Sequence, residues 1–260
     1  MTAQLQLFDS HCHLDFPQFA GKIDALLHKA EESGICGILI PGVKREGWRV
    51  IRQITARHRI CHTALGLHPM FIDSHQESHL HDLEMALSVG PLAAVGEIGL
   101  DYYKSDSNRD EQRKYFQAQI DIAKTARLPI LLHVRKAHDE VLQMLRNSHF
   151  NLGGICHAFN GSEYQAEKYI ELGFKLGFGG AMTFPRAAKL RKLAATLPLE
   201  SIVLETDAPD MLPITCKMPF NTPLHIFDNF RSLVELRQQS GVLIAKQTTA
   251  NVLSVLKLDK

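Results

Sequence analysis

Short apolar segments recur at a steady interval along this 260-residue chain, and segments with helical periodicity separate them. Two of the intervening segments, residues 23–33 and 112–126, place apolar side chains on one stripe at helical spacing. Strand–helix alternation repeated eight times within about 250 residues is typical of a (β/α)8 TIM barrel, an α/β fold. The expected strands cover residues 5–11, 37–41, 62–68, 92–100, 128–134, 154–158, 174–179 and 201–206.

Nothing along the chain divides it into smaller units. No linker rich in Pro, Gly or Ser and no low-complexity tract interrupts the alternation, so we expect residues 1–260 to form one domain. A doubly wound open sheet is the rival fold, because it also alternates strands and helices. Against it, no Gly-x-Gly-x-x-Gly motif follows the first strand, and polar residues end several strands rather than one or two.

Composition and charge narrow the class of protein. The formal net charge of +1 means that local basic loops, rather than a whole basic face, would have to hold any nucleic acid. The five cysteines form no Cys-x-x-Cys pair, which argues against a zinc ribbon and is typical of reduced thiols in a cytosolic protein. With no signal-peptide pattern and no apolar run of the ~20 residues that a membrane span needs, we expect a soluble, cytoplasmic protein.

The first strand ends in a pair of histidines. Because alternate side chains of an extended chain share a face, His11 and His13 point the same way, as half of a metal site would require. Asp9 lies on that face one step deeper, where it could accept a hydrogen bond from a histidine ring. The alternative is a chance pairing in a chain that has fourteen histidines.

Other strands also end in side chains that can bind metals. Active-site residues of a TIM barrel lie at the carboxyl ends of its strands, so chance placement explains this pattern poorly. The additional candidates are His68, Glu97, Asp101, His133, His157, Glu205 and Asp207. The histidines expected on solvated helices or loops are His28, His58, His75, His79, His81, His138 and His149.

The number and type of these ligands suit two divalent cations. His11, His13 and Asp207 can hold one ion. His133 and His157 can hold the other, with Glu97 as the bridge. Paired cations of this kind activate water for hydrolysis, with Glu97 and Asp207 as the catalytic carboxylates and Asp207 as the proton acceptor. Four imidazoles favour Zn, Mn or Ni over Mg.

Four further residues could support the site, and three of them have two interpretations each. His68 could bind substrate or position a neighbouring group, and Asp101 could face Glu97 or cap the following helix. Glu205 is expected to orient a ligand histidine. Arg135, at the mouth, could bind a phosphate of the substrate or be merely solvated. The aromatic residues that could stack on a base, or simply pack, are Tyr102, Tyr103, Phe159 and Phe184.

Six motifs, in order along most of the chain, resemble those of TatD-type metal-dependent deoxyribonucleases of the amidohydrolase-like superfamily. They are residues 8–14 (Phe-Asp-Ser-His-Cys-His-Leu), 66–69 (Gly-Leu-His-Pro), 95–101 (Val-Gly-Glu-Ile-Gly-Leu-Asp), 132–133 (Leu-His), 156–161 (Cys-His-Ala-Phe-Asn-Gly) and 204–209 (Leu-Glu-Thr-Asp-Ala-Pro). The resemblance implies that divalent metals bind at His11, His13, Glu97, His133, His157 and Asp207. It also implies hydrolysis of DNA phosphodiester bonds, with Mg as the precedent. One departure is Phe220-Asn221-Thr222-Pro223, where that family often has Arg-Asn before a Pro.

We therefore expect a metal-dependent hydrolase that cleaves DNA from an end. A near-neutral protein with a concave mouth can hold only a short single-stranded or frayed stretch, so single-stranded DNA is the expected partner, with no membrane and no obligate protein partner. The alternatives are hydrolysis of an amide, lactone or phosphotriester on the same barrel, and a metal-binding interaction protein without catalysis.

Overall fold

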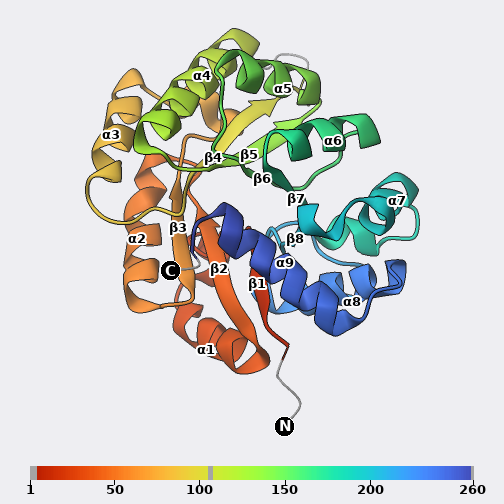
Figure 1. Ribbon diagram of the computed structural model, residues 1–260. Helices are drawn as coiled ribbons and strands as arrows, with labels where there is room; N and C mark the ends of the chain where they lie inside the picture. The colour runs from red at the N-terminus through yellow and green to blue at the C-terminus, as the bar shows by residue number, and fades with distance from the viewer. Residues whose placement is uncertain (1–4, 105–107, 259–260) are drawn as a thin grey trace.

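The computed structural model describes residues 5–104 and 108–258. Within these residues, parallel strands form one eight-stranded sheet in the order in which they follow along the chain (Figure 1). Helices alternate with the strands and surround them, so the predicted (β/α)8 barrel is confirmed. The strands are β1 (Leu7–Asp9), β2 (Ile35–Pro41), β3 (Cys61–Leu65), β4 (Ala94–Asp101), β5 (Ile130–Arg135), β6 (Gly154–Cys156), β7 (Phe174–Phe178) and β8 (Ile202–Leu204).

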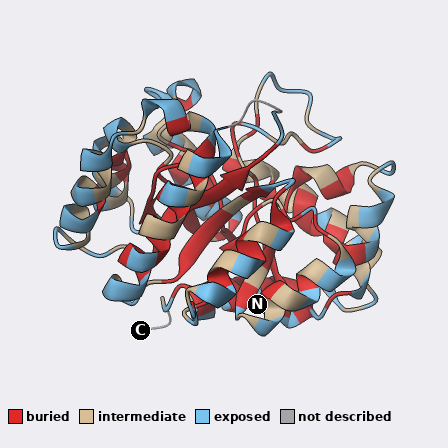
Figure 2. Cartoon of the chain, turned by 90° about the horizontal axis from the view of Figure 1, so that it is seen from above, coloured by how far each residue is buried: buried red, intermediate tan, exposed pale blue. Residues whose placement is uncertain are grey.

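The helices bury one face against the sheet and expose the other, as their sequence periodicity predicts (Figure 2). One helix has the predicted bounds of 23–33, whereas the predicted helix 112–126 begins earlier, where the Asn108 side chain accepts the backbone N–H of Glu111 and caps it. The helices are α1 (Ile23–Ser33), α2 (Trp48–Arg57), α3 (Glu77–Leu87), α4 (Arg109–Ala126), α5 (His138–Asn147), α6 (Glu163–Glu171), α7 (Ala188–Thr196), α8 (Ile226–Leu236) and α9 (Gly241–Val255).

All eight predicted strands are present, although most are shorter than their apolar segments. β1 ends at Asp9 instead of residue 11, and β3 ends at Leu65 instead of residue 68. Past these points the backbone turns over the mouth of the barrel and bonds to neighbouring loops, as in the hydrogen bond from His68 N–H to the carbonyl of Val43 (3.0 Å). The polar side chains that follow the strands therefore lie on loops that the sheet holds in place.

The barrel closes where the chain beyond β8 runs beside the chain beyond β1. The backbone N–H of Ser10 donates to the carbonyl of Leu204 (3.0 Å), and the N–H of Asp207 donates to the carbonyl of His11 (2.8 Å). One residue further along, a parallel β-bridge joins Cys12 to Ala208 in the segment beyond β8. This seam brings residues from the two ends of the sequence side by side.

Asp9 strengthens this seam. Its Oδ1 accepts the backbone N–H of Thr206 (2.9 Å) and that of His11 (3.3 Å), and its Oδ2 accepts the Thr206 hydroxyl (2.6 Å). The expectation that Asp9 bonds to a histidine ring is therefore wrong. Barrel closure places the carboxylate against the backbone of the last strand segment, which takes up both of its oxygens.

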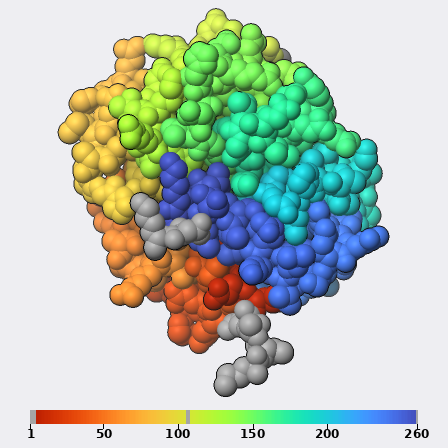
Figure 3. All heavy atoms as spheres, viewed as in Figure 1, coloured from red at the N-terminus to blue at the C-terminus, as the bar shows by residue number. Residues whose placement is uncertain are grey.

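The opposite end of the barrel is filled by apolar side chains. A buried layer of inward-facing residues, among them Phe8, Leu39 and Leu131, packs against Val252 and Val255 of α9. α9 crosses this face of the molecule in front of the strands (Figures 1 and 3). No helix in the described part of the chain is long and apolar enough to cross a membrane. The predicted extent of the domain, residues 1–260, reaches past the described residues and stays a prediction.

Thr206→Val tests the seam, because it keeps the side-chain shape but removes the hydroxyl that Asp9 accepts. A buried carboxylate oxygen left without its donor should lower the free energy of unfolding by about 2–3 kcal/mol, measured by urea denaturation. Thr206→Ser keeps the hydroxyl and should cost only roughly 1 kcal/mol for the lost methyl group. Equal stability of the valine variant and the natural protein would contradict this role of Asp9.

Candidate metal centre

Six predicted site residues meet at the carboxyl ends of the strands, where TIM-barrel active sites lie. They are His11, His13, Glu97, His133, His157 and Asp207. All are buried or nearly so, and the most accessible, His133 and Asp207, each keep 16% of the side chain exposed. The fold thus gathers donors from β1, β4, β5, β6 and β8, or from just beyond them, into one cluster at the bottom of the mouth.

Glu97 lies at the centre of this cluster. Its Oε2 is 3.2 Å from Nε2 of His11 and 3.7 Å from Nε2 of His13. Its Oε1 is 3.0 Å from Nδ1 of His133 and 4.0 Å from Nε2 of His157. Each oxygen therefore faces its own set of imidazoles, which is the arrangement that a bridging carboxylate needs.

Asp207 faces the cluster from the β8 side. Its Oδ1 lies 3.6 Å from Nε2 of both His11 and His13 and 3.7 Å from Nε2 of His157. The His157 ring also stacks on the His11 ring, with centroids 3.6 Å apart. His157 thus joins His11 and Asp207 in one potential metal-binding group. His157 and His133 also face the same oxygen of Glu97, Oε1, and the predicted sharing of one cation by these two histidines stays a prediction.

Glu205 gives the physical reason why His157 lies near Asp207. Its Oε1 lies 3.1 Å from Nδ1 of His157 and accepts the backbone N–H of Ala158 (2.7 Å), so the imidazole is held toward the β8 side. Gly177 leaves the necessary room, since a Cβ there would lie 2.1 Å from Glu205 Oε2. The expected contact of Glu205 with a candidate ligand histidine is therefore present in the structure.

His68 belongs to the wall of the cluster. Its Nδ1 accepts the backbone N–H of Met70 (3.0 Å), so a neutral ring carries its proton on Nε2. That nitrogen lies 3.2 Å from Oε1 of Glu97, to which it can donate. His68, Glu97 and His133 also form a group of potential metal donors. The tautomer favours a supporting role for His68, and substrate binding by it stays a prediction.

Asp101 holds the other side of His133. Its Oδ2 lies 2.9 Å from Nε2 of His133, and its Oδ1 accepts the backbone N–H of Tyr103 (2.9 Å). It does not cap the next helix, since Asn108 does so. With Nε2 engaged by Asp101, the ring of His133 presents Nδ1 to Glu97.

The spacing of the donors suits cations. Ligand atoms held tetrahedrally about 2.1 Å from one ion lie about 3.4 Å from one another. Here Nε2 of His11 is 3.1 Å from Nε2 of His13, 3.2 Å from Glu97 Oε2 and 3.6 Å from Asp207 Oδ1. Imidazole nitrogens and carboxylate oxygens at these distances match the donor set of a first-row divalent metal.

The electrostatics of the cluster also favour a bound cation. Burial, together with His157, holds the pKa of His11 well below its usual range, so its ring is neutral, as metal ligation requires. Burial raises the pKa of Asp207 to about 7. Burial disfavours the charged form of His157, but the surrounding carboxylates, first Glu205 and then Asp207, outweigh it and raise its pKa to about 10. These buried carboxylates favour a positive charge among them, which a bound cation supplies.

One residue that positions the site has no signal in periodicity or spacing, although it lies in the loop where the chain departs from the family motif. Asn221, in the loop after β8, donates from Nδ2 to the carbonyls of Thr206 (2.8 Å) and Asp210 (2.9 Å). It thereby fixes the segment that carries Asp207, whose φ of 55° is a conformation that few residues other than Gly, Asn and Asp adopt readily. The contact joins an irregular loop to a strand end, so neither periodicity nor spacing could predict it.

Two other predicted residues lie away from the donors. Arg135 is exposed at the rim, with its guanidinium carbon 3.6 Å from the ring centroid of Tyr103. Its role in substrate binding stays a prediction.

The expectation that His138 is solvated is wrong, because it is buried against α6, with Nδ1 3.3 Å from the Tyr169 hydroxyl and Nε2 3.2 Å from Oδ1 of Asn160.

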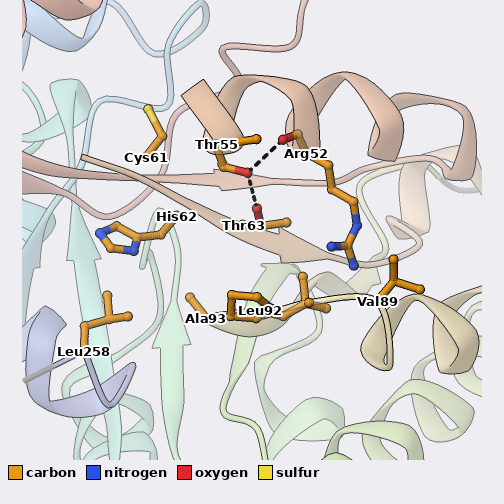
Figure 4. A pocket seen from close by; sticks show the side chains of 12 residues that line it. Arg52, Thr55, Cys61, His62, Thr63, Val89, Leu92, Ala93 and Leu258 are labelled. Carbon is orange, nitrogen blue, oxygen red and sulfur yellow. Dashed lines mark hydrogen bonds between the residues drawn. The ribbon is translucent and has the colours of Figure 1, made fainter. Parts of the chain in front are cut away.

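A hollow of about 300 Å³ lies at the other end of the barrel, near the start of β3 and the residues before β4 (Figure 4). Its polar side chains already have partners. Arg52 donates to the carbonyl of Ala86 (2.6 Å), and the hydroxyls of Thr55 and Thr63 bond to each other (2.8 Å). This hollow shares no residue with the donor cluster, and chemistry in TIM barrels takes place at the opposite face.

The chain is similar to known proteins along nearly its whole length. The sequence profile of the family described as TatD related DNase matches residues 8–257. YjjV of Escherichia coli (strain K12), an uncharacterized metal-dependent hydrolase, is 36% identical over 255 residues, which cover 97% of this chain and 98% of the relative. The 3'-5' ssDNA/RNA exonuclease TatD of Citrobacter koseri is 31% identical over 254 residues, covering 95% and 97%. The crystal structure of Escherichia coli YjjV, a TatD homologue, superposes with a TM-score of 0.93 at 36% identity, covering 96% of this chain and 98% of that one.

Glu97→Ala tests the central position of Glu97. If this carboxylate bridges two cations, the purified protein should carry up to two equivalents of metal, and the variant should lose at least one together with most activity. Elemental analysis of protein dialysed against each metal measures the content. Glu171→Ala, at an exposed carboxylate on α6, is the matched control and should bind as much metal as the natural protein. A single tightly held metal, unchanged in the Glu97 variant, would refute the bridging role.

Proposed function

Because the chain belongs to the TatD-related DNase family, we propose that it is a metal-dependent phosphodiesterase that cleaves single-stranded or frayed DNA from an end. The observation that carries this proposal is the position of Glu97, whose two oxygens face separate sets of imidazoles. A donor set divided by one carboxylate suits a two-cation hydrolase. The relative from Citrobacter koseri, named as an exonuclease of single-stranded DNA and RNA, supports the substrate class.

We assign two divalent cations to the cluster, with Glu97 between them. His11, His13 and Asp207 would hold one ion, and His133 would hold the second. His157 lies within reach of both groups, nearer to Asp207 than to Glu97. When bound, such cations lower the pKa of water toward ~7 and stabilise the charge on the phosphoryl group.

Asp207 is our candidate for the proton acceptor. A carboxylate that binds a cation through one oxygen can still present its second oxygen to the attacking water. Since Oδ1 faces the imidazoles, we assign Oδ2 to take the proton of the attacking water. The water oxygen then bonds to phosphorus, the phosphorus bond to the leaving ester oxygen breaks, and that oxygen takes up a proton.

The surroundings of the cluster favour an end of a single strand over a duplex. The donors are almost wholly buried at the base of the mouth, so a rigid duplex has to fray before its backbone reaches them. The net charge of +1 supplies no broad basic face. Binding by a few rim cations, Arg135 among them, suits a short stretch of one strand.

A side-by-side assay with Mg, Mn and Zn decides the activity. The substrates are end-labelled single-stranded DNA, single-stranded RNA, duplex DNA, and a panel of lactones and phosphotriesters. We expect stepwise loss from an end of single-stranded DNA and at least 100-fold less activity in Glu97→Ala, as is usual for loss of a main electrostatic group. Turnover of a small ester with nucleic acids intact in every metal would overturn the substrate class.

The rate should fall as pH decreases through about 6–7, because protonated imidazoles cannot bind metal and a protonated Asp207 cannot accept a proton. Both effects have the same sign, so activity is present above this range and lost below it. Initial rates and retained metal are measured on the same samples. A flat rate down to about pH 5 with metal still bound would contradict histidine ligation.

A further inference from the structure

A second hollow lies directly beside the donor cluster, at the mouth of the barrel. Its volume is about 310 Å³, and it is lined by residues of the loops after β3 and β4, by the last residues of β4 and β5, and by the start of α4. This volume is at the lower end of the range of about 300–1,000 Å³ typical of small-molecule sites. Five of its lining residues carry the inference: Met70, Asp101, Tyr103, Lys104 and Arg135.

Two apolar residues of the lining are unusually exposed. Tyr103 keeps 53% and Met70 keeps 57% of the surface accessible. Single exposed apolar residues are normal, but two that line one hollow beside a buried polar cluster suggest a ligand with a flat apolar part. Among the other aromatic candidates, Tyr102 and Phe159 are buried. They pack rather than stack on a ligand.

Hydrogen bonds connect the backbone of Met70 and the backbone of Tyr103 to the donor cluster. The backbone N–H of Met70 donates to His68, whose other nitrogen lies 3.2 Å from Glu97. The backbone N–H of Tyr103 donates to Asp101, which lies 2.9 Å from His133. These bonds hold the backbone of Met70 and of Tyr103 near candidate ligands, so the hollow has a defined position relative to the donor cluster.

The hollow also has cations suited to phosphate. The Arg135 guanidinium lies over the ring of Tyr103 and helps to lower the pKa of the Asp101 carboxyl, but no salt bridge joins it to a carboxylate of the described residues. Lys104 adds a second positive charge to the lining. An aromatic ring, a flexible thioether and an unpaired guanidinium side by side match the base and phosphate of one nucleotide.

We propose that this hollow is the nucleoside subsite next to the scissile phosphate. The base lies between Met70 and Tyr103, and Arg135 binds a neighbouring phosphate. Every base has an apolar face, so the subsite accepts all four. The subsite rests on the proposed nuclease function, because it selects polynucleotides over other phosphodiesters. Tyr103 is then a specificity-determining residue, and Arg135 has a fixed partner in the substrate.

Equilibrium binding without turnover tests the subsite. A short single-stranded oligonucleotide with 2-aminopurine near one end, and its counterpart labelled near the other end, are titrated in EDTA and followed by fluorescence. We expect quenching for the label that enters the hollow and a roughly 10-fold higher Kd for Tyr103→Ala. Tyr103→Phe should bind as the natural protein does, since it keeps the ring. The matched control is Tyr164→Ala. Tyr164 is an exposed tyrosine of α6 with a cation, Lys168, over its ring, and it lies outside the hollow.

A second titration uses an oligonucleotide that lacks the base at the position where quenching is seen. It should bind the natural protein about 10-fold more weakly than the intact strand, and Tyr103→Ala should bind both equally, because base and ring act as a pair. Equal binding by Tyr103→Ala and Tyr164→Ala, or additive losses, would overturn the subsite even if the natural protein degrades DNA. If binding depends on Tyr103 but no metal supports cleavage of DNA or RNA, the subsite stands and the proposed function falls.

Discussion

The constraint on which the site depends is closure of the barrel between the chain beyond β1 and the chain beyond β8. Asp9 accepts hydrogen bonds from Thr206, and the backbone of Asp207 bonds to that of His11. Without this seam, the histidine pair near the start of the sequence and Asp207 would belong to separate edges of an open sheet. Closure brings them within 3.6 Å and fixes the side of the cluster from which Asp207 acts.

Within the closed barrel, the buried carboxylates determine how the imidazoles lie. Glu205 and Asp101 each hold the outer nitrogen of one histidine, so that His157 presents Nε2 and His133 presents Nδ1 to the centre. Partners of this kind fix the orientation of a ligand ring and raise its basicity. A cluster of imidazoles and carboxylates that the barrel desolvates favours positive charge in its midst. The same low-dielectric setting strengthens the attraction between the carboxylates and any cation bound there.

Two side chains, those of His68 and Asp101, connect the exposed rim to the buried cluster. His68 and Asp101 each touch the cluster with one end and bond to a rim backbone N–H with the other. A change in a rim loop is therefore transmitted to the orientation of His133 or to the charge on Glu97. This connection gives a physical reason for substrate preference to vary between barrels that share one set of donors.

Strand–helix alternation and polar residues at strand ends are local patterns, so the sequence alone was enough to predict the barrel and the candidate donors. How these donors meet depends on the tertiary structure. The contact of His157 with His11 and Asp207, the bond of Asp9 to Thr206 and the hold of Asn221 on the β8 loop all join segments distant along the chain. Spacing along a strand tells which face a side chain takes, but its rotation and partners depend on neighbouring strands that only the closed barrel brings into contact.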